Sequence, residues 1–145
     1  MSTIAVKKLN KNAILPTYGS PEAAGADLYA CLEAPVTIEA GETAFIPTGF
    51  AMEVPKGCAG LIYARSSLGT KRGLAPANKV GVIDSDYRGQ VMVALHNHGK
   101  VSQTVAHGER IAQLLITPVL TPGYEEAEEL TDTARGQGGF GSTGK

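Results

Sequence analysis

Three polar side chains stand at positions where they could take part in chemistry. Asp84 directly follows the apolar run GVI, where a carboxylate is poorly solvated unless it has a partner or a role in chemistry. It is therefore a general-base candidate. Arg65 ends another apolar run and precedes two serines, which together offer donors for phosphate oxygens. Gln113 lies among aliphatic residues, where a buried amide either completes a core hydrogen-bond network or positions a water.

Each of these positions also has a purely structural interpretation. The stretch DSDYRG can be a hairpin turn between the strands KVGVI and QVMVAL, and ARSSLG can be a capped turn with a surface arginine. Strand alternation would place Gln113 on the same face as Ile111 and Leu115, and the neighbouring Arg110 is expected in an ion pair. The residues alone indicate a nucleotide or phosphate substrate without identifying it.

The glycine-rich end of the chain, RGQGGFGSTGK, raises a related possibility. It contains the pattern GxxxxGK of phosphate-binding loops, but such a loop needs a Ser or Thr next and then a helix, and neither follows. This stretch buries too little apolar surface to order itself, and Phe140 in its middle is costly to order unless it binds a surface. We therefore expect either C-terminal disorder or a lid that closes over a ligand.

The segments that must position these residues have the pattern of short strands separated by turns. Runs such as TIAVKKL, ADLYACL, GLIYAR and QVMVALHN are rich in β-branched and aliphatic residues, and YGSP, PKG and HG are turn signals. This spacing predicts an all-β sandwich, jelly roll or barrel. One short helix is expected at Ser66–Thr70, where a serine can cap, whereas EEAEEL is expected to be extended or irregular.

The runs QVMVALHN and RIAQLLITPV are almost continuously apolar. Both faces of these strands are therefore expected to be covered, and a small single sheet cannot cover both by itself. A second sheet or a subunit partner must contribute, which predicts an oligomer.

Composition excludes several classes of protein. The 145 residues suffice for one domain with a core, and the net charge of −1 argues against nucleic-acid binding. No apolar run approaches the ~20 residues that cross a bilayer, and the N-terminus has no apolar block of signal-peptide length. We therefore expect a cytoplasmic protein without membrane contact.

The cysteines and histidines offer no recognisable metal site. Cys31 and Cys58 stand far apart, and both are expected to be buried as small apolar residues. His96, His98 and His107 do not have the spacing of a known metal-binding motif. The stretch HNHG is expected to end a hairpin. The stretch DSDYRG also lacks the glutamate that a calcium loop needs at its twelfth position.

Five motifs, however, follow one another in a familiar order. They are AGADL at 24–28, RSSLG at 65–69, GVIDSDYRG at 81–89, GERIAQ at 108–113 and RGQGGFGSTG at 135–144. Together they resemble the trimeric deoxyuridine triphosphate nucleotidohydrolases, the dUTPases. The resemblance implies a jelly-roll-like (β-clip) domain at residues 1–134 and a flexible arm at residues 135–145. It also implies a homotrimer with shared sites, each closed by the arm of another chain.

The resemblance further implies an activity and the residues that perform it. The enzyme would hydrolyse dUTP to dUMP and pyrophosphate, which limits uracil incorporation into DNA and supplies dUMP for dTMP synthesis. Asp84 would be the general base for water attack on the α-phosphorus, and Gln113 would hold that water or the α-phosphate. Phosphate binding and stabilisation of the leaving pyrophosphate would fall to Arg65, Ser66 and Ser67.

Nucleoside recognition would come from the third motif and its neighbours. The uracil edge would be bound by one side chain and a stretch of backbone, namely Asn78, Gly81, Val82 and Ile83. Tyr87 would lie under the sugar and leave no room for a 2′-hydroxyl, and Met92 would offer a backbone contact. Gln90 stands where many relatives carry an acidic residue, and we assign no chemical role to this difference.

The arm and a metal would complete the site. Phe140 would stack on uracil and Arg135 would reach the γ-phosphate, while Gly141, Ser142 and Thr143 would add amides and hydroxyls. The GxxxxGK match would then be a coincidence of composition. Asp27 would meet a Mg²⁺ only through water, because this ion binds mainly substrate phosphates, although Asp27 could equally brace its loop.

Two other functions remain open at this point. A dCTP deaminase, or its bifunctional relative, shares the fold, but those enzymes carry a glutamate where Ala94 stands, and no carboxylate lies between Gln90 and Asn97. A non-catalytic nucleotide-binding trimer is the second alternative. The presence of Asp84, Gln113 and Arg65 favours the enzyme.

Overall fold

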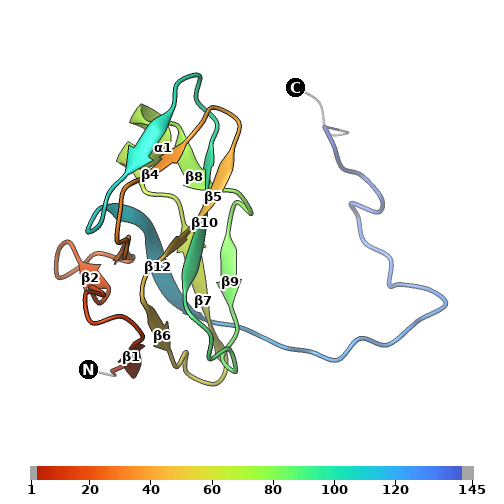
Figure 1. Ribbon diagram of the computed structural model, residues 1–145. Helices are drawn as coiled ribbons and strands as arrows, with labels where there is room; N and C mark the ends of the chain where they lie inside the picture. Colours follow the sequence, from red (N-terminus) through yellow and green to blue (C-terminus); the bar gives the residue numbers. More distant parts are fainter. Residues whose placement is uncertain (1–2, 142–145) are drawn as a thin grey trace.

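The computed structural model describes residues 3–141, which form strands and one short helix (Figure 1). The helix is α1 (Ser66–Lys71). The strands are β1 (Val6–Lys8), β2 (Thr17–Tyr18), β3 (Ala26–Tyr29), β4 (Val36–Ile38), β5 (Thr43–Pro47), β6 (Phe50–Met52), β7 (Cys58–Tyr63), β8 (Leu74–Pro76), β9 (Gly81–Ile83), β10 (Met92–Asn97), β11 (Gln103–Val105) and β12 (Arg110–Pro118). The predicted all-β class and the predicted helix are confirmed, and EEAEEL is irregular as expected.

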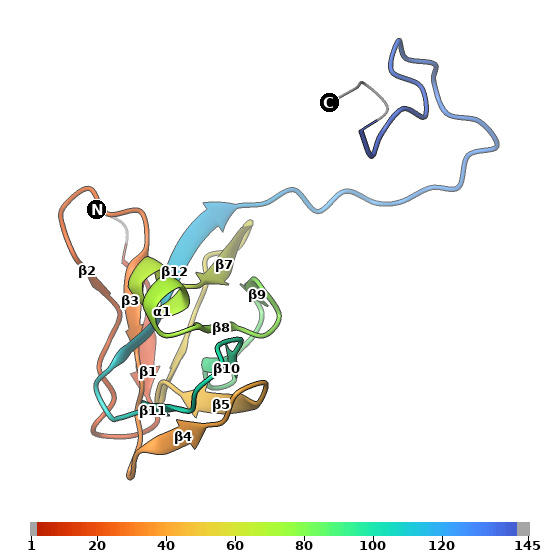
Figure 2. The ribbon, with the colours of Figure 1, turned by 90° about the horizontal axis from the view of Figure 1, so that it is seen from above.

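The largest sheet has five strands in the order β2-β3-β12-β7-β9, and a second sheet has the order β5-β10-β8. Figure 2 shows these two sheets as separate layers. Their alternating inward residues fill the core between them, because successive side chains of a strand point to opposite faces. Leu28 and Ile62 contribute from the larger sheet, and Ile46, Val93 and Leu95 from the smaller.

The centre of the five-stranded sheet fixes the positions of most candidate site residues. β12 pairs antiparallel with β3 on one side and β7 on the other, so that Gln113 lies opposite both Asp27 and Tyr63. β9 pairs with the far side of β7, with Ile83 opposite Gly60. This sheet therefore carries all or part of the first, third and fourth motifs, and the second motif follows β7 at the start of α1.

Three details differ from the sequence-based expectations. β9 and β10 do not pair with each other, since β9 pairs with β7 and β10 pairs with β5 and β8; DSDYRG therefore crosses between sheets. HNHG likewise leads to β11, which pairs with β4 rather than β10. The cap of α1 is Arg65, in an extended conformation without a side-chain hydrogen bond, so no serine caps this helix.

Of the two strands expected to be covered on both faces, β10 is covered on only one within this chain. β10 alternates between buried residues and more accessible ones, with Met92 37% exposed. Phe45, which lies opposite Ala94 in β5, is 72% exposed. A large aromatic side chain left in water on a sheet face is a typical feature of an interaction surface.

After Val119 the chain leaves the body and extends away from it (Figures 1 and 2). Within this C-terminal segment, residues 120–141, the side chains of Leu120, Tyr124, Leu130 and Phe140 are almost fully exposed. The hydrogen bonds of the segment's described residues join residues of the segment itself. The segment therefore takes no part in the core of its own chain. The predicted boundary between residues 134 and 135 stays a prediction.

The cysteines only partly match their expected burial. Cys31 is buried, but Cys58, at the start of β7, is partly exposed, and both are free thiols. In residues 3–141 no helix is long and apolar enough to span a bilayer.

Candidate active site

Two arginines hold the carboxylate of Asp27 in β3. The Arg65 Nε lies 2.8 Å from Oδ1 of Asp27, and an Arg110 terminal nitrogen lies 3.3 Å from Oδ2. The side chains of Asp27 and Arg65 are only 13% and 21% exposed, which makes this pair stronger than an ordinary surface ion pair. The ion pair expected for Arg110 is confirmed, and Asp27 braces the arginine at the start of α1.

Gln113 lies beside this cluster, at the register position opposite Asp27. Its Nε2 donates a 2.8 Å hydrogen bond to the carbonyl of Ala64, next to Arg65. Its Oε1 packs against Gly25, where an added Cβ would come within 2.6 Å. Leu115 shares this face with Gln113, but Ile111 does not, because the register of β12 shifts between Arg110 and Ala112.

A cleft of about 490 Å³ adjoins Arg65 and the first turn of α1. The charged residues that line it are four cations, Arg65, Lys71, Arg72 and Arg110, and one carboxylate, Glu109. The Arg72 guanidinium is committed to Glu109, Gln103 and the carbonyl of Thr104. Ser66 and Ser67 are exposed at the N-terminus of α1, where backbone amides lack helical partners. This arrangement suits a polyanion.

A second, smaller pocket of about 200 Å³ lies between β9 and β10. No backbone ladder joins these two strands, so the backbone N–H and C=O groups that face the gap do not hydrogen-bond across it. Six of the predicted nucleoside contacts line this pocket, namely Asn78, Gly81, Val82, Ile83, Tyr87 and Met92. The third motif therefore forms one recess that could bind a flat ring through its edges.

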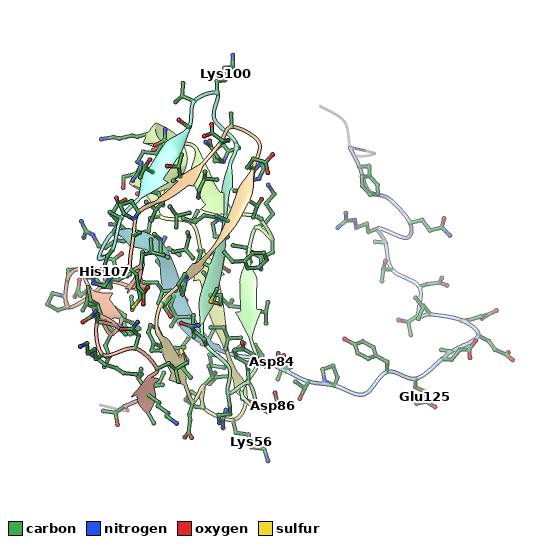
Figure 3. All side chains as sticks on the ribbon, in the orientation of Figure 1. Lys56, Asp84, Asp86, Lys100, His107 and Glu125 are labelled. Atoms are coloured by element: carbon green, nitrogen blue, oxygen red, sulfur yellow. The ribbon has the colours of Figure 1, made fainter. Side chains whose placement is uncertain are left out.

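Asp84 lines the same pocket, at the end of β9 (Figure 3). The expectation that this carboxylate is poorly solvated is wrong for the single chain, because Asp84 is exposed. It takes part in none of the four ion pairs found among the described residues. Its carboxylate is therefore free to bind a water or a partner.

One chain does not bring Asp84 to the cluster of Asp27, Arg65 and Gln113. Asp84 follows Ile83, which lies opposite Gly60, so continuing the register puts Asp84 level with Ala59, whereas Gln113 lies opposite Tyr63, four residues along β7 and on its other side. This corresponds to about 13 Å along the strand and about 10 Å across two strand spacings. Figures 1 and 3 agree, since Asp84 lies at the end of the body far from α1. A single water cannot contact both groups in one chain.

The predicted arm residues lie far from either cluster of their own chain. Arg135 folds locally, with its Nε donating to the carbonyl of Gly138 at 2.8 Å. Phe140 is fully exposed, and Gly141 is exposed beside it. Ser142 and Thr143 lie outside the described residues.

The described residues do not form a metal site of their own. No group of three or more His, Cys, Asp or Glu side chains is close enough to hold an ion within residues 3–141. Asp27 already has an arginine on each oxygen. These residues fit a Mg²⁺ only if substrate phosphates supply most of its ligands and Asp27 contacts it through water.

Sequence reasoning missed two contributors to this site. Arg110 reaches both Asp27 and the cation-lined cleft, although only the ion pair was expected. Gly25 allows Gln113 to lie close to β3, and a glycine just before a strand was the available signal for such an approach.

Removing the carboxylate of Asp27 should destabilise the fold. Asp27→Ala leaves two arginines without their counter-charge, and we expect the free energy of unfolding to fall by about 1–3 kcal/mol. Urea titration at a fixed protein concentration measures the change. Glu53→Ala is the matched control, because its pair with Arg88 is exposed and 3.7 Å long, so a loss below about 0.5 kcal/mol is expected. Equal losses would show that Asp27 is an ordinary surface residue.

Comparison with known proteins identifies the family. The dUTPase family model matches residues 11–144. The deoxyuridine 5'-triphosphate nucleotidohydrolase of Hahella chejuensis is 48% identical over 139 residues, covering 95% of this chain and 91% of that protein. The protein of the same name from Janthinobacterium sp. is 49% identical over 148 residues, covering 100% of this chain and 99% of that protein.

A solved structure agrees with these sequence matches. The dUTPase of Staphylococcus bacteriophage 80alpha, solved with dUPNHPP, superposes with a TM-score of 0.92 at 31% identity and covers 100% of both chains. The order of the five motifs, the jelly-roll-like fold and these matches lead to one conclusion. The chain belongs to the dUTPase family and is an enzyme of that family.

Proposed function

We propose that this enzyme hydrolyses dUTP to dUMP and pyrophosphate. The observation that carries the proposal is the presence of two complementary recesses: a ring-sized pocket beside a free carboxylate, and a cation-lined cleft suited to phosphates. The dUTPase family model and the names of the relatives support the same substrate. Hydrolysis of dUTP would limit uracil incorporation into DNA and supply dUMP for dTMP synthesis.

The reaction is a displacement at the α-phosphorus. Asp84 accepts a proton from a water whose oxygen forms a bond to the α-phosphorus. The bond between that phosphorus and the oxygen bridging to the β-phosphorus breaks, and its electrons leave with pyrophosphate. Gln113 holds the water or an α-phosphate oxygen, and the donors of Arg65, Ser66 and Ser67 stabilise the charge on the leaving group.

The base and sugar bind in the recess between β9 and β10. The backbone groups of Gly81–Ile83 on the side away from β7 and the side chain of Asn78 can hydrogen-bond the edge of uracil, with the backbone of Met92 on the other side. Cytosine presents the opposite donor and acceptor at one edge position, so a site shaped for uracil leaves polar groups unpaired when cytosine enters. This arrangement provides the discrimination between the two pyrimidines.

The complete site requires more than one chain. Asp84 and the Asp27–Arg65–Gln113 cluster are too far apart within one protomer, so we place the pocket between β9 and β10 of one protomer against the cluster of a neighbour in a homotrimer. The exposed Phe45 and Met92 support an extensive protein contact on this side of the molecule. The arm of another protomer then supplies Phe140 over uracil and Arg135 at the γ-phosphate, with Gly141, Ser142 and Thr143 beside them.

Mg²⁺ is the proposed metal, bound chiefly by the triphosphate. The ion would neutralise phosphate charge and fix the conformation of the chain of phosphates. Asp27 would contact it through water, while the two arginines keep that carboxylate oriented.

A product assay tests the proposed function directly. Release of pyrophosphate from dUTP supports it, whereas ammonia release from dCTP would indicate a deaminase. Binding of dUTP without either product would indicate a non-catalytic nucleotide-binding protein. Light scattering on the same sample measures whether the protein is a trimer.

Tyr87→Ala should weaken the discrimination between dUTP and UTP. The ring of Tyr87 lines the pocket and is the proposed barrier to a 2′-hydroxyl, so its removal makes room for ribose. We expect the ratio of kcat/KM for dUTP over UTP to fall by about 10-fold or more. Tyr87→Phe keeps the ring and should keep the ratio. A Tyr87→Ala enzyme that still rejects UTP would contradict the sugar contact.

A further inference from the structure

The side chain of Tyr87 lies across the backbone of Gly89, two residues along the chain. A Cβ at residue 89 would lie 2.4 Å from the Tyr87 hydroxyl oxygen, 2.6 Å from Cζ and 3.0 Å from Cε2. Such distances are too short for non-bonded atoms, and an aromatic ring cannot yield by bending. The observed position of the ring therefore requires a residue without a side chain at position 89.

The backbone does not require a glycine at this position. Gly89 is absent from the residues that adopt a positive φ. An alanine could therefore adopt the same backbone conformation without strain. The three atoms nearest to an added Cβ all belong to the side chain of Tyr87, so the space that this side chain takes is a local reason for glycine.

The surface on which the ring rests is itself fixed to the core. The Tyr87 hydroxyl donates to the carbonyl of Gln90 at 3.1 Å, and the Gln90 Oε1 accepts a 3.0 Å hydrogen bond from the amide of Gly49. The next residue, Val91, is buried, and its carbonyl accepts a 2.7 Å hydrogen bond from the Thr48 hydroxyl. The backbone that contacts the ring is therefore tied to the core by hydrogen bonds.

We propose that Gly89 is a specificity-determining positioning residue, which selects deoxyribose by letting the ring of Tyr87 lie flat against the backbone. This inference rests on the proposed function. A side chain at position 89 occupies the space that the ring now fills, so the ring must rotate away from the pocket into water, where Tyr87 is already 46% exposed. The sugar pocket then loses its wall, and a ribose 2′-hydroxyl is accepted.

Gly89→Ala tests this role through substrate choice. We expect the ratio of kcat/KM for dUTP over UTP to fall by about 10-fold or more, with a melting temperature close to that of the unchanged protein. Gly19→Ala is the matched control, because a Cβ there meets nothing within 4 Å and the backbone has no positive φ. Its ratio should not change. An unchanged ratio in Gly89→Ala overturns the inference.

A double-mutant cycle separates positioning from a general structural effect. If Gly89 acts through Tyr87, adding Gly89→Ala to Tyr87→Ala has no further effect on the ratio, because the clashing ring is gone. Additive effects would overturn the inference, and this double variant remains informative if Gly89→Ala alone fails to fold. Failure of the unchanged protein to release pyrophosphate from dUTP would instead refute the proposed function, which distinguishes the two failures.

Discussion

Asp84→Asn is expected to lower the turnover of dUTP by about 10²- to 10⁴-fold while dUTP still binds. The amide has nearly the shape of the carboxylate but cannot accept a proton from the attacking water. Asp84 makes no ion pair within residues 3–141, so the substitution should leave the fold intact. Steady-state measurement of kcat, together with dUTP binding by calorimetry, tests both parts of this expectation.

Asp86→Asn is the control for this experiment. Asp86 is also an exposed aspartate in the same turn, two residues away, but it does not line the pocket between β9 and β10 (Figure 3). Its substitution makes the same change in net charge and should leave kcat within about twofold, as expected for an exposed charge. If kcat is unchanged in Asp84→Asn, or falls equally in both variants, Asp84 is not the general base.

Deletion of residues 136–145 is expected to reduce activity by about 100-fold or more without unfolding the protein. The C-terminal segment adds nothing to the core of its own chain, since its large side chains are exposed, including Phe140. Its loss should therefore leave the melting temperature within a few degrees. The activity should fall because the proposed lid excludes water and orients the nucleotide.

Lys145→Ala separates a lid from a phosphate-binding loop of the GxxxxGK type. In the lid interpretation the lysine is not needed, and the variant should retain full activity. A large loss on removing this lysine alone would favour the phosphate-loop interpretation. A melting temperature that collapses on deletion of residues 136–145 would instead show that the segment is structural.

Much of the fold could be predicted from the sequence, because long runs of β-branched and aliphatic residues specify strands locally. GLIYAR and QVMVALHN became β7 and β10 with only small differences in their ends. β2, β8 and β11 were missed because strands of two or three residues carry almost no periodic signal. Pairing was also missed at DSDYRG. The strands on either side of it have the local pattern of a hairpin, but β9 pairs with β7 and β10 pairs with β5 and β8.

The candidate residues could be named from the motifs, but their arrangement could not. Motif order places Asp84 and Gln113 in one functional set, whereas the register of β7 separates them within a chain. Register is set jointly by the hydrophobic patterns of the paired strands and by the turns between them, so neither motif alone reveals it. The same reasoning explains why the exposure of Asp84 was not foreseen, since the end of an apolar strand can lie at the surface of a protomer.

The most direct test of a site shared between protomers uses two inactive variants together. Asp84→Asn and Arg65→Ala are each expected to be inactive as homotrimers. Co-expression with two different affinity tags, followed by purification over both, yields mixed trimers. In each mixed trimer one site, or about one third of the sites, combines an intact Asp84 from one protomer with an intact Arg65 from its neighbour. We predict that the mixed trimers recover about this fraction of the dUTP hydrolysis of the unchanged enzyme. Mixed trimers as inactive as either parent variant would show that both residues act within one chain.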